Sequence, residues 1–327
     1  MLKRLKGLVP LAAIAGAAAL AGSAAPAFAQ LGRAVPGQMD FPEPATPVMH
    51  AIVDFHNFVN PLIILIALFV LALMLYVMWR FSEKNNPTPS QTTHNTLLEV
   101  AWTVIPILIL VAISIPSFKL LHLQYSYPKP DLTIKATGNA WYWTHGYPDF
   151  GGFEFDSNML SNEEVAALQE KGVDAPRLLS VDNPVVVPVN KVVHVLITSN
   201  DVIHNWTVQP FGSKVDAVPG RLTSTWFKVE REGMFYGQCS ELCGLNHAFM
   251  PIAIKVVAEN VFNDWAAAMK AKDKKKAKQI ISDAGSVEPG TKSGTKSGTK
   301  SVAAIPGQAP GQTPGQTPGQ TPGLAAN

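Results

Sequence analysis

The sequence contains few cysteines, and its positive and negative charges nearly balance. Only two cysteines occur among 327 residues, Cys239 and Cys243, four positions apart in one segment. Disulfide-rich domains carry cysteines spread along a short chain, so this pair excludes a disulfide framework. The chain also lacks a Cys-x-x-Cys-His motif, which excludes an attached haem c module. A net charge of +2 gives no indication of nucleic acid as a partner.

Apolar residues, by contrast, are more abundant than one ordinary core requires. They make up 47% of the chain, and the surplus lies in three blocks near the N-terminus. The first block, residues 8–20, follows three basic residues and precedes the small residues Ala-Phe-Ala at 27–29. This arrangement is typical of a cleaved signal peptide, which we assign to residues 1–29. A first transmembrane anchor is the alternative, but the run is short and rich in alanine and glycine.

The second and third blocks, residues 58–79 and 97–115, are each long enough to cross a bilayer core of about 30 Å. The short polar segment between them carries Arg80 and Lys84, and the positive-inside tendency assigns it to the cytoplasm. The segments on either side are then periplasmic, in agreement with a signal peptide. A buried helix of a soluble protein is the alternative for either block, but it would need a larger core than the remaining sequence can form.

Beyond Tyr125 the sequence changes to short runs that favour β-strands, separated by proline, glycine and asparagine. Spacing of this kind predicts a β-sandwich or β-barrel. Ser161 and Glu164 form a capping box that predicts a helix within this region, and another helix is predicted at 261–278. The predicted strands are 132–136, 141–145, 178–181, 185–189, 192–198, 224–229, 234–238 and 252–257.

These features predict a membrane-anchored all-β protein with five segments. From about residue 287 the chain repeats Gly-Thr-Lys-Ser and then Pro-Gly-Gln-Thr, a composition typical of disorder. The predicted boundaries are 1–29 for the cleaved signal peptide, 30–57 for a periplasmic N-terminal segment, 58–121 for a two-helix transmembrane hairpin, 122–280 for a periplasmic β domain and 281–327 for a disordered tail.

The residues that indicate chemistry lie in one short segment and at one earlier position. Cys239, Cys243, His247 and Met250 share the segment, and His204 precedes it. Two thiolates, two imidazoles and a thioether form a soft ligand set that suits copper. A mononuclear blue-copper site needs only one cysteine, so the second cysteine indicates two metal ions that both thiolates can bridge. Met250 and a backbone carbonyl are then candidates for weak axial ligands.

Two other interpretations of these residues remain. The cysteines could form a small disulfide in an oxidising compartment, or all the ligands could bind one zinc ion. Either alone would leave Met250 without a role. His204 by itself is more typical of an ordinary strand residue, and only its combination with the later segment makes it a ligand candidate.

The segment resembles the copper-binding loop of subunit II of the haem–copper oxidases, and the resemblance extends over nearly all of residues 40–275. In that family the pattern Cys-x-Glu-x-Cys-x-x-x-His-x-x-Met builds a binuclear CuA centre on a cupredoxin-like Greek-key β domain. The family's upstream histidine is matched by His204. The pattern itself is matched at Cys239, Glu241, Cys243, His247 and Met250.

The resemblance implies two roles for Glu241. Its backbone carbonyl would bind copper, while its side chain would face a magnesium or manganese site shared with subunit I. Subunit II of the quinol oxidases keeps the fold but lacks the copper ligands. The intact ligand set therefore implies cytochrome c as the electron donor.

A second point of resemblance is the aromatic sequence Trp-Tyr-Trp at 141–143. Trp141 matches the tryptophan through which electrons enter in the family, and Tyr142 lies beside it. Aromatic residues in a strand are more often core residues or cross-strand pairs. The family usually has Gly-His-Gln before this motif, whereas this chain has Gly138-Asn139-Ala140. This departure puts the usual polar contacts beside the tryptophan in doubt.

Glu99 lies near the cytoplasmic end of the third apolar block, where an ionisable group is costly and therefore a functional candidate. In the family an acid after a His-Asn-Thr stretch, found here at 94–96, marks the entrance of a proton pathway. An interfacial acid that reaches water is the alternative.

Several acidic residues could form a patch that attracts a lysine-rich cytochrome c. Complementary charge of this kind mainly accelerates encounter between the two proteins. Each acid taken alone is more often an ordinary solvated residue. The candidates are Asp216, which is the best match to the family, Asp201, Glu154 and Asp156.

The resemblance therefore implies a subunit of a proton-translocating cytochrome c oxidase in a bacterial inner membrane. The chain would receive electrons, while oxygen would be reduced in subunit I. Both termini and the copper domain would lie in the periplasm, and the expected partners are cytochrome c, subunit I, subunit III and the lipid bilayer. A membrane-tethered copper carrier is the alternative, but such a protein would favour exposed methionine and cysteine motifs in flexible sequence.

Overall fold

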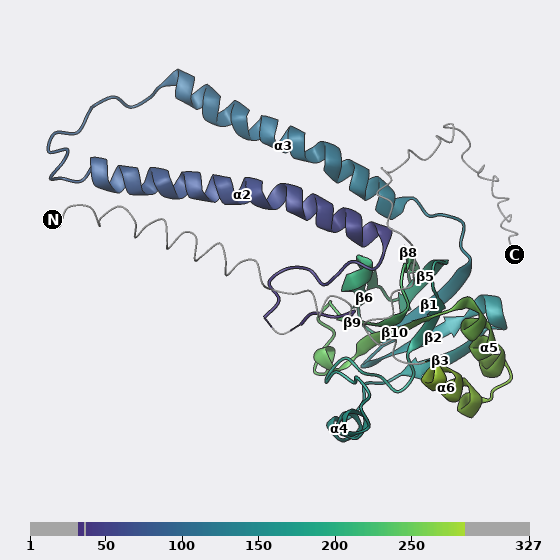
Figure 1. Ribbon diagram of the computed structural model, residues 1–327. Helices are drawn as coiled ribbons and strands as arrows, with labels where there is room; N and C mark the ends of the chain where they lie inside the picture. The colour runs from purple at the N-terminus through teal and green to yellow at the C-terminus, as the bar shows by residue number, and fades with distance from the viewer. Residues whose placement is uncertain (1–31, 36, 285–327) are drawn as a thin grey trace, which may run out of the picture. The chain divides into compact units, whose positions relative to one another are not determined.

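The computed structural model describes residues 32–35 and 37–284 (Figure 1). The predicted signal peptide, 1–29, lies outside the described residues. So does the predicted disordered tail, 281–327, apart from its first four positions.

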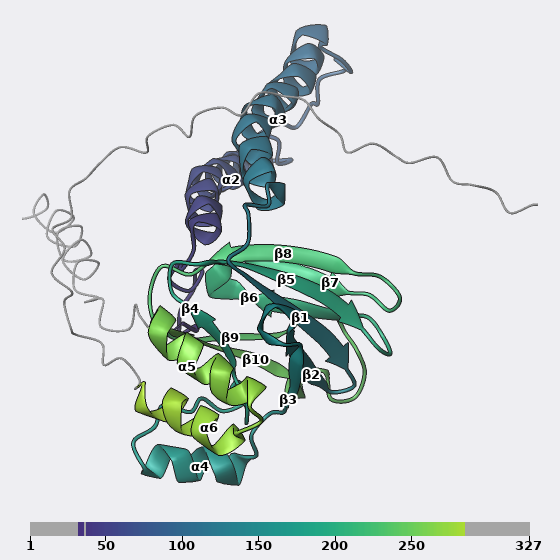
Figure 2. The same ribbon diagram turned by 90° about the vertical axis from the view of Figure 1, so that its right-hand side faces the viewer.

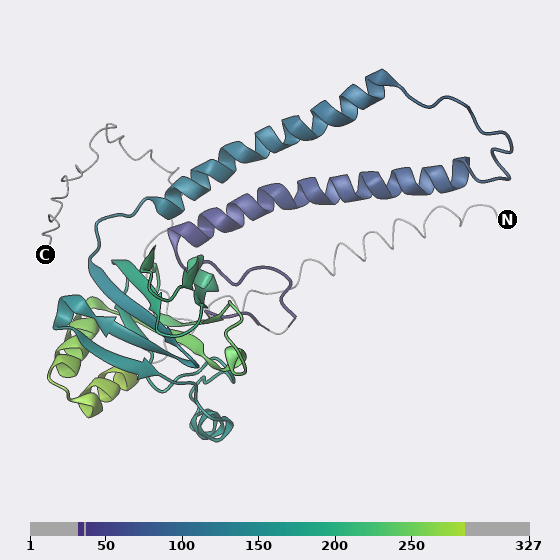
Figure 3. The same ribbon diagram turned by 180° about the vertical axis from the view of Figure 1, so that it is seen from behind.

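Two long helices precede the β-strands. Helix α2 spans Pro47–Arg80 and helix α3 spans Thr96–Tyr125, and both are long and apolar enough to cross a membrane. Each begins at a polar cap: the Thr46 side chain accepts from the Met49 amide, and the Asn95 side chain accepts from the Leu98 amide. The two helices run side by side (Figure 3). Their middle sections expose large apolar side chains, as a lipid-facing surface requires.

The predicted apolar blocks lie inside these helices, but the helices are longer than the blocks. Because Thr46 provides the cap and proline is favoured in a first helical turn, α2 begins at Pro47 rather than near residue 58. Part of the segment predicted as 30–57 is therefore helical.

The β domain contains two five-stranded sheets (Figure 2). Their strand orders are β3-β2-β1-β5-β8 and β4-β10-β9-β6-β7. Neighbouring strands are antiparallel except for the parallel pairs β1/β5 and β4/β10. This arrangement agrees with the predicted cupredoxin-like β-sandwich. The strands are β1 Leu132–Asn139, β2 Tyr142–Tyr147, β3 Phe153–Ser157, β4 Val185–Pro188, β5 Val192–Ser199, β6 His204–Val208, β7 Ser213–Ala217, β8 Thr223–Lys228, β9 Gly233–Cys239 and β10 Pro251–Val257.

Apolar side chains from both sheets form the core. Along β5 buried and half-buried residues alternate, as expected for a strand with one face on the core, whereas every residue of β10 is buried. Helix α5, Glu259–Lys270, covers the aromatic residues of β2 and β3, where the Trp265 ring lies 5.1 Å from that of Tyr147. These contacts attach the helix to the β-sandwich through the aromatic residues of these two strands.

In the β domain one prediction of secondary structure is confirmed, one is wrong, and three strands were not predicted. Helix α4, Asn162–Glu170, begins with the predicted capping box, in which Ser161 and Glu164 each bond the other's backbone amide. The predicted strand at 178–181 is wrong: Leu178 has a left-handed φ of 64°, and only Val181 makes an isolated bridge. Strands β3, β6 and β7 are not among the predicted strands.

The predicted single helix at 261–278 is also wrong, because the chain forms two helices there. Helix α5 ends before Lys272, whose φ of 61° interrupts the helical backbone. Asp273 then caps helix α6, Lys274–Asp283, by accepting from the Lys276 amide at 3.0 Å. Positions 281–283 of the predicted tail belong to this helix.

Candidate metal centre

The predicted ligands meet at one end of the β domain because neighbouring strands end there. His204 is the first residue of β6 and Cys239 is the last residue of β9. The two strands pair through Trp206 and Cys239, which places the histidine beside the cysteine. Cys243 lies in the loop after β9, and His247 and Met250 follow it on and after a short 3-10 helix.

The donor atoms of these residues lie within a few ångströms of one another. The two Sγ atoms are 3.9 Å apart, and both cysteines are free thiols. The Nδ1 atom of His204 lies 3.9 Å from Cys239 Sγ, and that of His247 lies 3.5 Å from Cys243 Sγ. On the same loop, Met250 Sδ is 3.5 Å from Cys243 Sγ. The backbone oxygen of Glu241 is 3.4 Å from Cys239 Sγ.

This donor set fits copper. Metal–thiolate bonds are about 2.3 Å long, so two sulfurs at this separation can both bind an ion that lies between them. Each sulfur has its own imidazole nitrogen, and a weak donor lies on either side, the Met250 thioether and the Glu241 carbonyl. Soft thiolate and thioether ligands together with imidazole favour copper. His204, both cysteines and Met250 are buried, as suits a site shielded from water.

The two thiols differ in acidity. Burial opposes ionisation of Cys239, but its hydrogen bonds with His204, Asn205 and Glu241 lower its pKa to about 7. Burial, followed by the negative charge of Cys239, raises the pKa of Cys243 to about 12.

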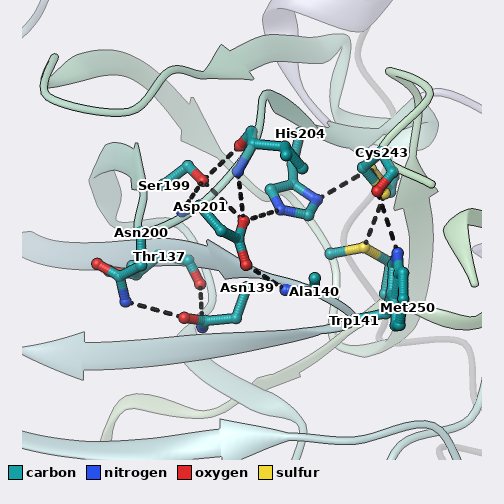
Figure 4. A network of polar contacts seen from close by, with 12 residues as sticks. Thr137, Asn139, Ala140, Trp141, Ser199, Asn200, Asp201, His204, Cys243 and Met250 are labelled. Atoms are coloured by element: carbon teal, nitrogen blue, oxygen red, sulfur yellow. Dashed lines mark hydrogen bonds and ion pairs between the residues drawn. The ribbon is translucent and has the colours of Figure 1, made fainter.

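Tryptophan side chains support the loop from two directions. Trp141 Nε1–H donates to the Cys243 carbonyl at 3.1 Å (Figure 4). Its ring also packs on Gly244, whose φ of 116° and lack of a Cβ allow this approach. Trp143 is fully buried, donates to the Met250 carbonyl at 3.3 Å, and lies with its ring centroid 5.9 Å from that of His204. Tyr142 lies half-buried between the two tryptophans.

The sequence indicated Trp143 only as a member of the aromatic cluster 141–143, without its contacts to Met250 and His204, and it gave no role at the site to Gly138. A Cβ atom on Gly138 would lie 2.7 Å from His204 Cδ2, so this glycine makes room for the ligand ring. Gly138 stands just before the aromatic motif, but nothing in the local sequence indicates that the ring of a residue on β6 fills this space. The contact depends on the sandwich bringing β1 and β6 together.

The four predicted docking acids lie in different environments. Asp201 Oδ1 accepts from His204 Nε2 at 2.8 Å, and Asp216 Oδ1 accepts from Asn205 Nδ2 at 2.6 Å, so both are next to the β6 strand. Glu154 and Asp156 lie on the edge strand β3. There Glu154 pairs with Lys135 at 3.7 Å, and Asp156 accepts from the Thr144 hydroxyl at 2.7 Å.

The side chains of two further predicted residues make no contact with the cluster of donor atoms among the interactions of the described residues. The side chain of Glu241 is exposed, and only its backbone oxygen approaches a cysteine sulfur. Glu99 lies in the first turn of α3. The β domain follows the other end of this helix. It is not one of the residues that form the candidate metal centre.

Comparison with known proteins gives relatives over both parts of the chain. The family described as cytochrome C oxidase subunit II, transmembrane domain, matches residues 34–120, and the family described as its periplasmic domain matches residues 132–257. The probable cytochrome c oxidase subunit 2 of Rickettsia felis is 49% identical over 71% of this chain and 72% of its own length. The cytochrome c oxidase subunit 2 of Cereibacter sphaeroides is 46% identical over 76% of this chain and 88% of its own length.

A solved structure is also similar. The periplasmic domain of subunit II of cytochrome oxidase of Bradyrhizobium japonicum is 57% identical, with a TM-score of 0.40, over 44% of this chain and 97% of that one. The matched families extend over both the helical pair and the β-sandwich that carries the thiol and imidazole cluster. The chain belongs to the cytochrome c oxidase subunit II family.

Proposed function

We propose that this chain receives electrons from cytochrome c at a binuclear copper centre and passes them to haem in subunit I. The observation that carries the proposal is the pair of free thiols 3.9 Å apart, each with its own imidazole nitrogen. One metal ion would need only one of these thiolates in a blue-copper site. Two thiolates between two imidazoles instead provide a bridged site for two ions.

The residues divide the binding between the two ions. Cys239 and Cys243 would hold both ions, and His204 and His247 would each bind one of them. Met250 and the Glu241 carbonyl would supply the two weaker donors. When bound, the copper pair supplies a one-electron redox centre. The sandwich holds ligands from β6, β9 and the following loop in place, which keeps the rearrangement between oxidation states small.

Trp141 is the residue we assign to the arrival of electrons. Its indole N–H donates to the carbonyl of Cys243, so it contacts the ligand loop directly. Tyr142 follows it along β2 and is half-exposed beside it. A cytochrome c that docks over Trp141 would therefore be one hydrogen bond from a copper-ligating residue.

Acidic side chains would guide the encounter with cytochrome c. We assign this role to Asp216 together with Asp201, Glu154 and Asp156, because a lysine-rich partner is attracted by carboxylates near the site. Such charges act mainly on the association rate and lose their effect as the salt concentration rises.

The remaining assignments concern the membrane and the partner subunits. With residues 1–29 cleaved, both termini and the β domain would lie in the periplasm of a bacterial inner membrane. The Glu241 side chain, which is exposed, would face a magnesium or manganese ion shared with subunit I, and subunit III would complete the assembly. Glu99 would lie at the cytoplasmic entrance of a proton pathway.

The assembled oxidase with Trp141→Phe tests the electron route. The substitution removes the hydrogen bond to Cys243 but no copper ligand. We expect the rate of electron transfer from reduced cytochrome c to fall by about tenfold, or ~1.4 kcal/mol in the barrier, with unchanged copper content.

Trp226→Phe is the matched control for this experiment. Trp226 also donates its indole N–H to a backbone carbonyl at 3.1 Å, but its acceptor is Gln124, away from the ligand loop. Stopped-flow spectroscopy measures the rate of electron transfer from reduced cytochrome c. Equal rates in wild-type and Trp141→Phe oxidase would contradict the assignment of Trp141 to electron entry.

A further inference from the structure

Asp201 connects a copper-ligand candidate to the segment that carries Trp141. One carboxylate oxygen, Oδ1, accepts from His204 Nε2 at 2.8 Å, and the other, Oδ2, accepts from the Ala140 amide at 2.6 Å (Figure 4). Oδ1 also accepts from the Val202 amide at 2.7 Å and from the Ser199 hydroxyl at 3.3 Å. Both oxygens are thus engaged within the chain.

The segments on either side of Asp201 are tied together by a pair of asparagines. Asn200 Nδ2 donates to Asn139 Oδ1 at 2.8 Å, and the backbone N–H of Asn200 donates to the Gly138 carbonyl at 3.1 Å. The buried Asn139 side chain also donates to the Thr137 carbonyl and to the Thr144 hydroxyl. The turn between β1 and β2 is therefore fastened to the turn between β5 and β6.

The arrangement determines which nitrogen of His204 faces the thiols. In the neutral tautomer whose Nε2–H donates to Asp201, Nδ1 carries no proton and lies on the side of Cys239 Sγ, where it can bind a metal ion. A carboxylate that accepts from a ligating histidine fixes the ring, selects its tautomer and makes it a stronger donor. The backbone amide of Ala140 donates to the same carboxylate, so the ring of His204 and the backbone before Trp141 are both hydrogen-bonded to Asp201.

We propose that Asp201 is a positioning residue for electron transfer: it orients His204 toward the copper and fixes the Trp141 segment relative to it, with Asn139 and Asn200 holding the two turns together. This inference rests on the proposed function, since it presumes that His204 binds copper. It adds to the docking role of Asp201 rather than replacing it, because the side chain is 35% exposed and its charge still faces the surface.

The test uses the assembled oxidase with Asp201→Asn and, as matched control, Asp216→Asn. Asp216 is also an acid beside β6, but it accepts from the Asn205 side chain and not from His204. The measurements are copper content, the electron-spin-resonance spectrum, the midpoint potential of the copper and the salt dependence of electron transfer from cytochrome c.

For Asp201→Asn we expect copper affinity to fall about tenfold, as is usual when the partner of a ligating histidine is removed. A weaker imidazole donor favours the reduced ion, so the midpoint potential should rise by about 59 mV, a tenfold change in the ratio of oxidised to reduced copper. The resonance spectrum should change, whereas Asp216→Asn should leave both spectrum and potential as in the wild type.

A wild-type spectrum and potential in Asp201→Asn, with only a weaker salt dependence, would overturn the proposal and leave Asp201 with a docking role alone. If Asp201→Asn fails to assemble, Asn200→Ala decides, because it removes only the amide bonded to Asn139 and should shift the potential in the same direction by less. Copper content of the wild-type protein distinguishes this result from a failure of the proposed function, because in that case the wild type itself would bind fewer than two coppers.

Discussion

At the scale of single residues, the candidate metal centre depends on small side chains as much as on its ligands. Gly138 lies on β1 opposite Trp143, and its missing side chain leaves the space that the His204 ring occupies. Gly244 does the same for the Trp141 ring. The ligand loop and the β6 ligand are therefore both positioned by contacts that larger residues would remove.

Gly138→Ala should displace His204. The added Cβ would lie 2.7 Å from the ring atom Cδ2 and 3.0 Å from Cγ, closer than unbonded atoms approach, so the ring must move. We expect copper affinity of the full-length chain to fall about tenfold or more, a loss comparable with that from disturbing the support of a metal ligand, while the β domain stays folded.

Gly146→Ala is the control for this substitution. It lies on β2 of the same sheet, and its added Cβ would approach only the exposed Glu154 side chain, which can rotate away. Copper titration with a competing chelator measures the effect, and equal affinities of the two variants would contradict this view of Gly138.

The sequence was sufficient to predict the candidate ligands that the structure brings together, but not the residues that support them. The thiols, His247 and Met250 lie within one motif, and their chemistry can be read locally. The bond from Trp143 to the Met250 carbonyl joins residues 107 positions apart, and it exists only once two sheets have packed. Asp201 lies three residues before His204, but its carboxylate also accepts from the backbone amide of Ala140, in the distant turn between β1 and β2.

At the scale of the elements, strands with regular apolar runs were predictable and polar strands were not. Strand β5 alternates buried and half-buried residues, whereas β6 reads His-Asn-Trp-Thr-Val and is buried throughout, so its sequence has no apolar alternation that would mark it as a strand. The helix break at Lys272 was missed because a lysine-rich run favours a continuous helix, and the left-handed φ there has no signal such as glycine.

His145 makes the β domain sensitive to acid. It is fully buried on β2, where Nδ1 bonds the Ser157 hydroxyl and Nε2 has no hydrogen-bond partner within the described part of the chain. Burial lowers the pKa of His145 from 6.5 to about 3. Between these pH values the unfolded chain binds a proton that the folded chain does not, so the free energy of unfolding decreases as the pH falls below about 6.5.

His145→Phe should remove this part of the acid sensitivity. At pH 5 the wild type should lose up to about 2 kcal/mol relative to pH 8 through this group, and the variant should not. Denaturant titrations of the full-length chain in detergent, at both pH values, measure the difference. His94→Gln, in the exposed loop between α2 and α3, should keep the wild-type dependence. An unchanged pH dependence in His145→Phe would contradict the assignment.

At the scale of the whole molecule, two apolar helices precede a β-sandwich. The thiol and imidazole cluster lies at one end of this sandwich, where β6 begins and β9 ends. The sequence predicted this order because a bilayer-spanning run and a copper-binding loop are both local patterns. The division into a cleaved signal, a hairpin, a β domain and a tail stays a prediction, as does the periplasmic side of the membrane.

The most direct test of the central claim is the copper stoichiometry and electron-spin-resonance spectrum of the full-length chain in detergent, loaded with copper and mildly oxidised. The bridged arrangement of Cys239 and Cys243 predicts two coppers for each chain that share one unpaired electron, and Cys243→Ser should abolish this signature. One copper for each chain, or bound zinc without such a spectrum, would contradict the account.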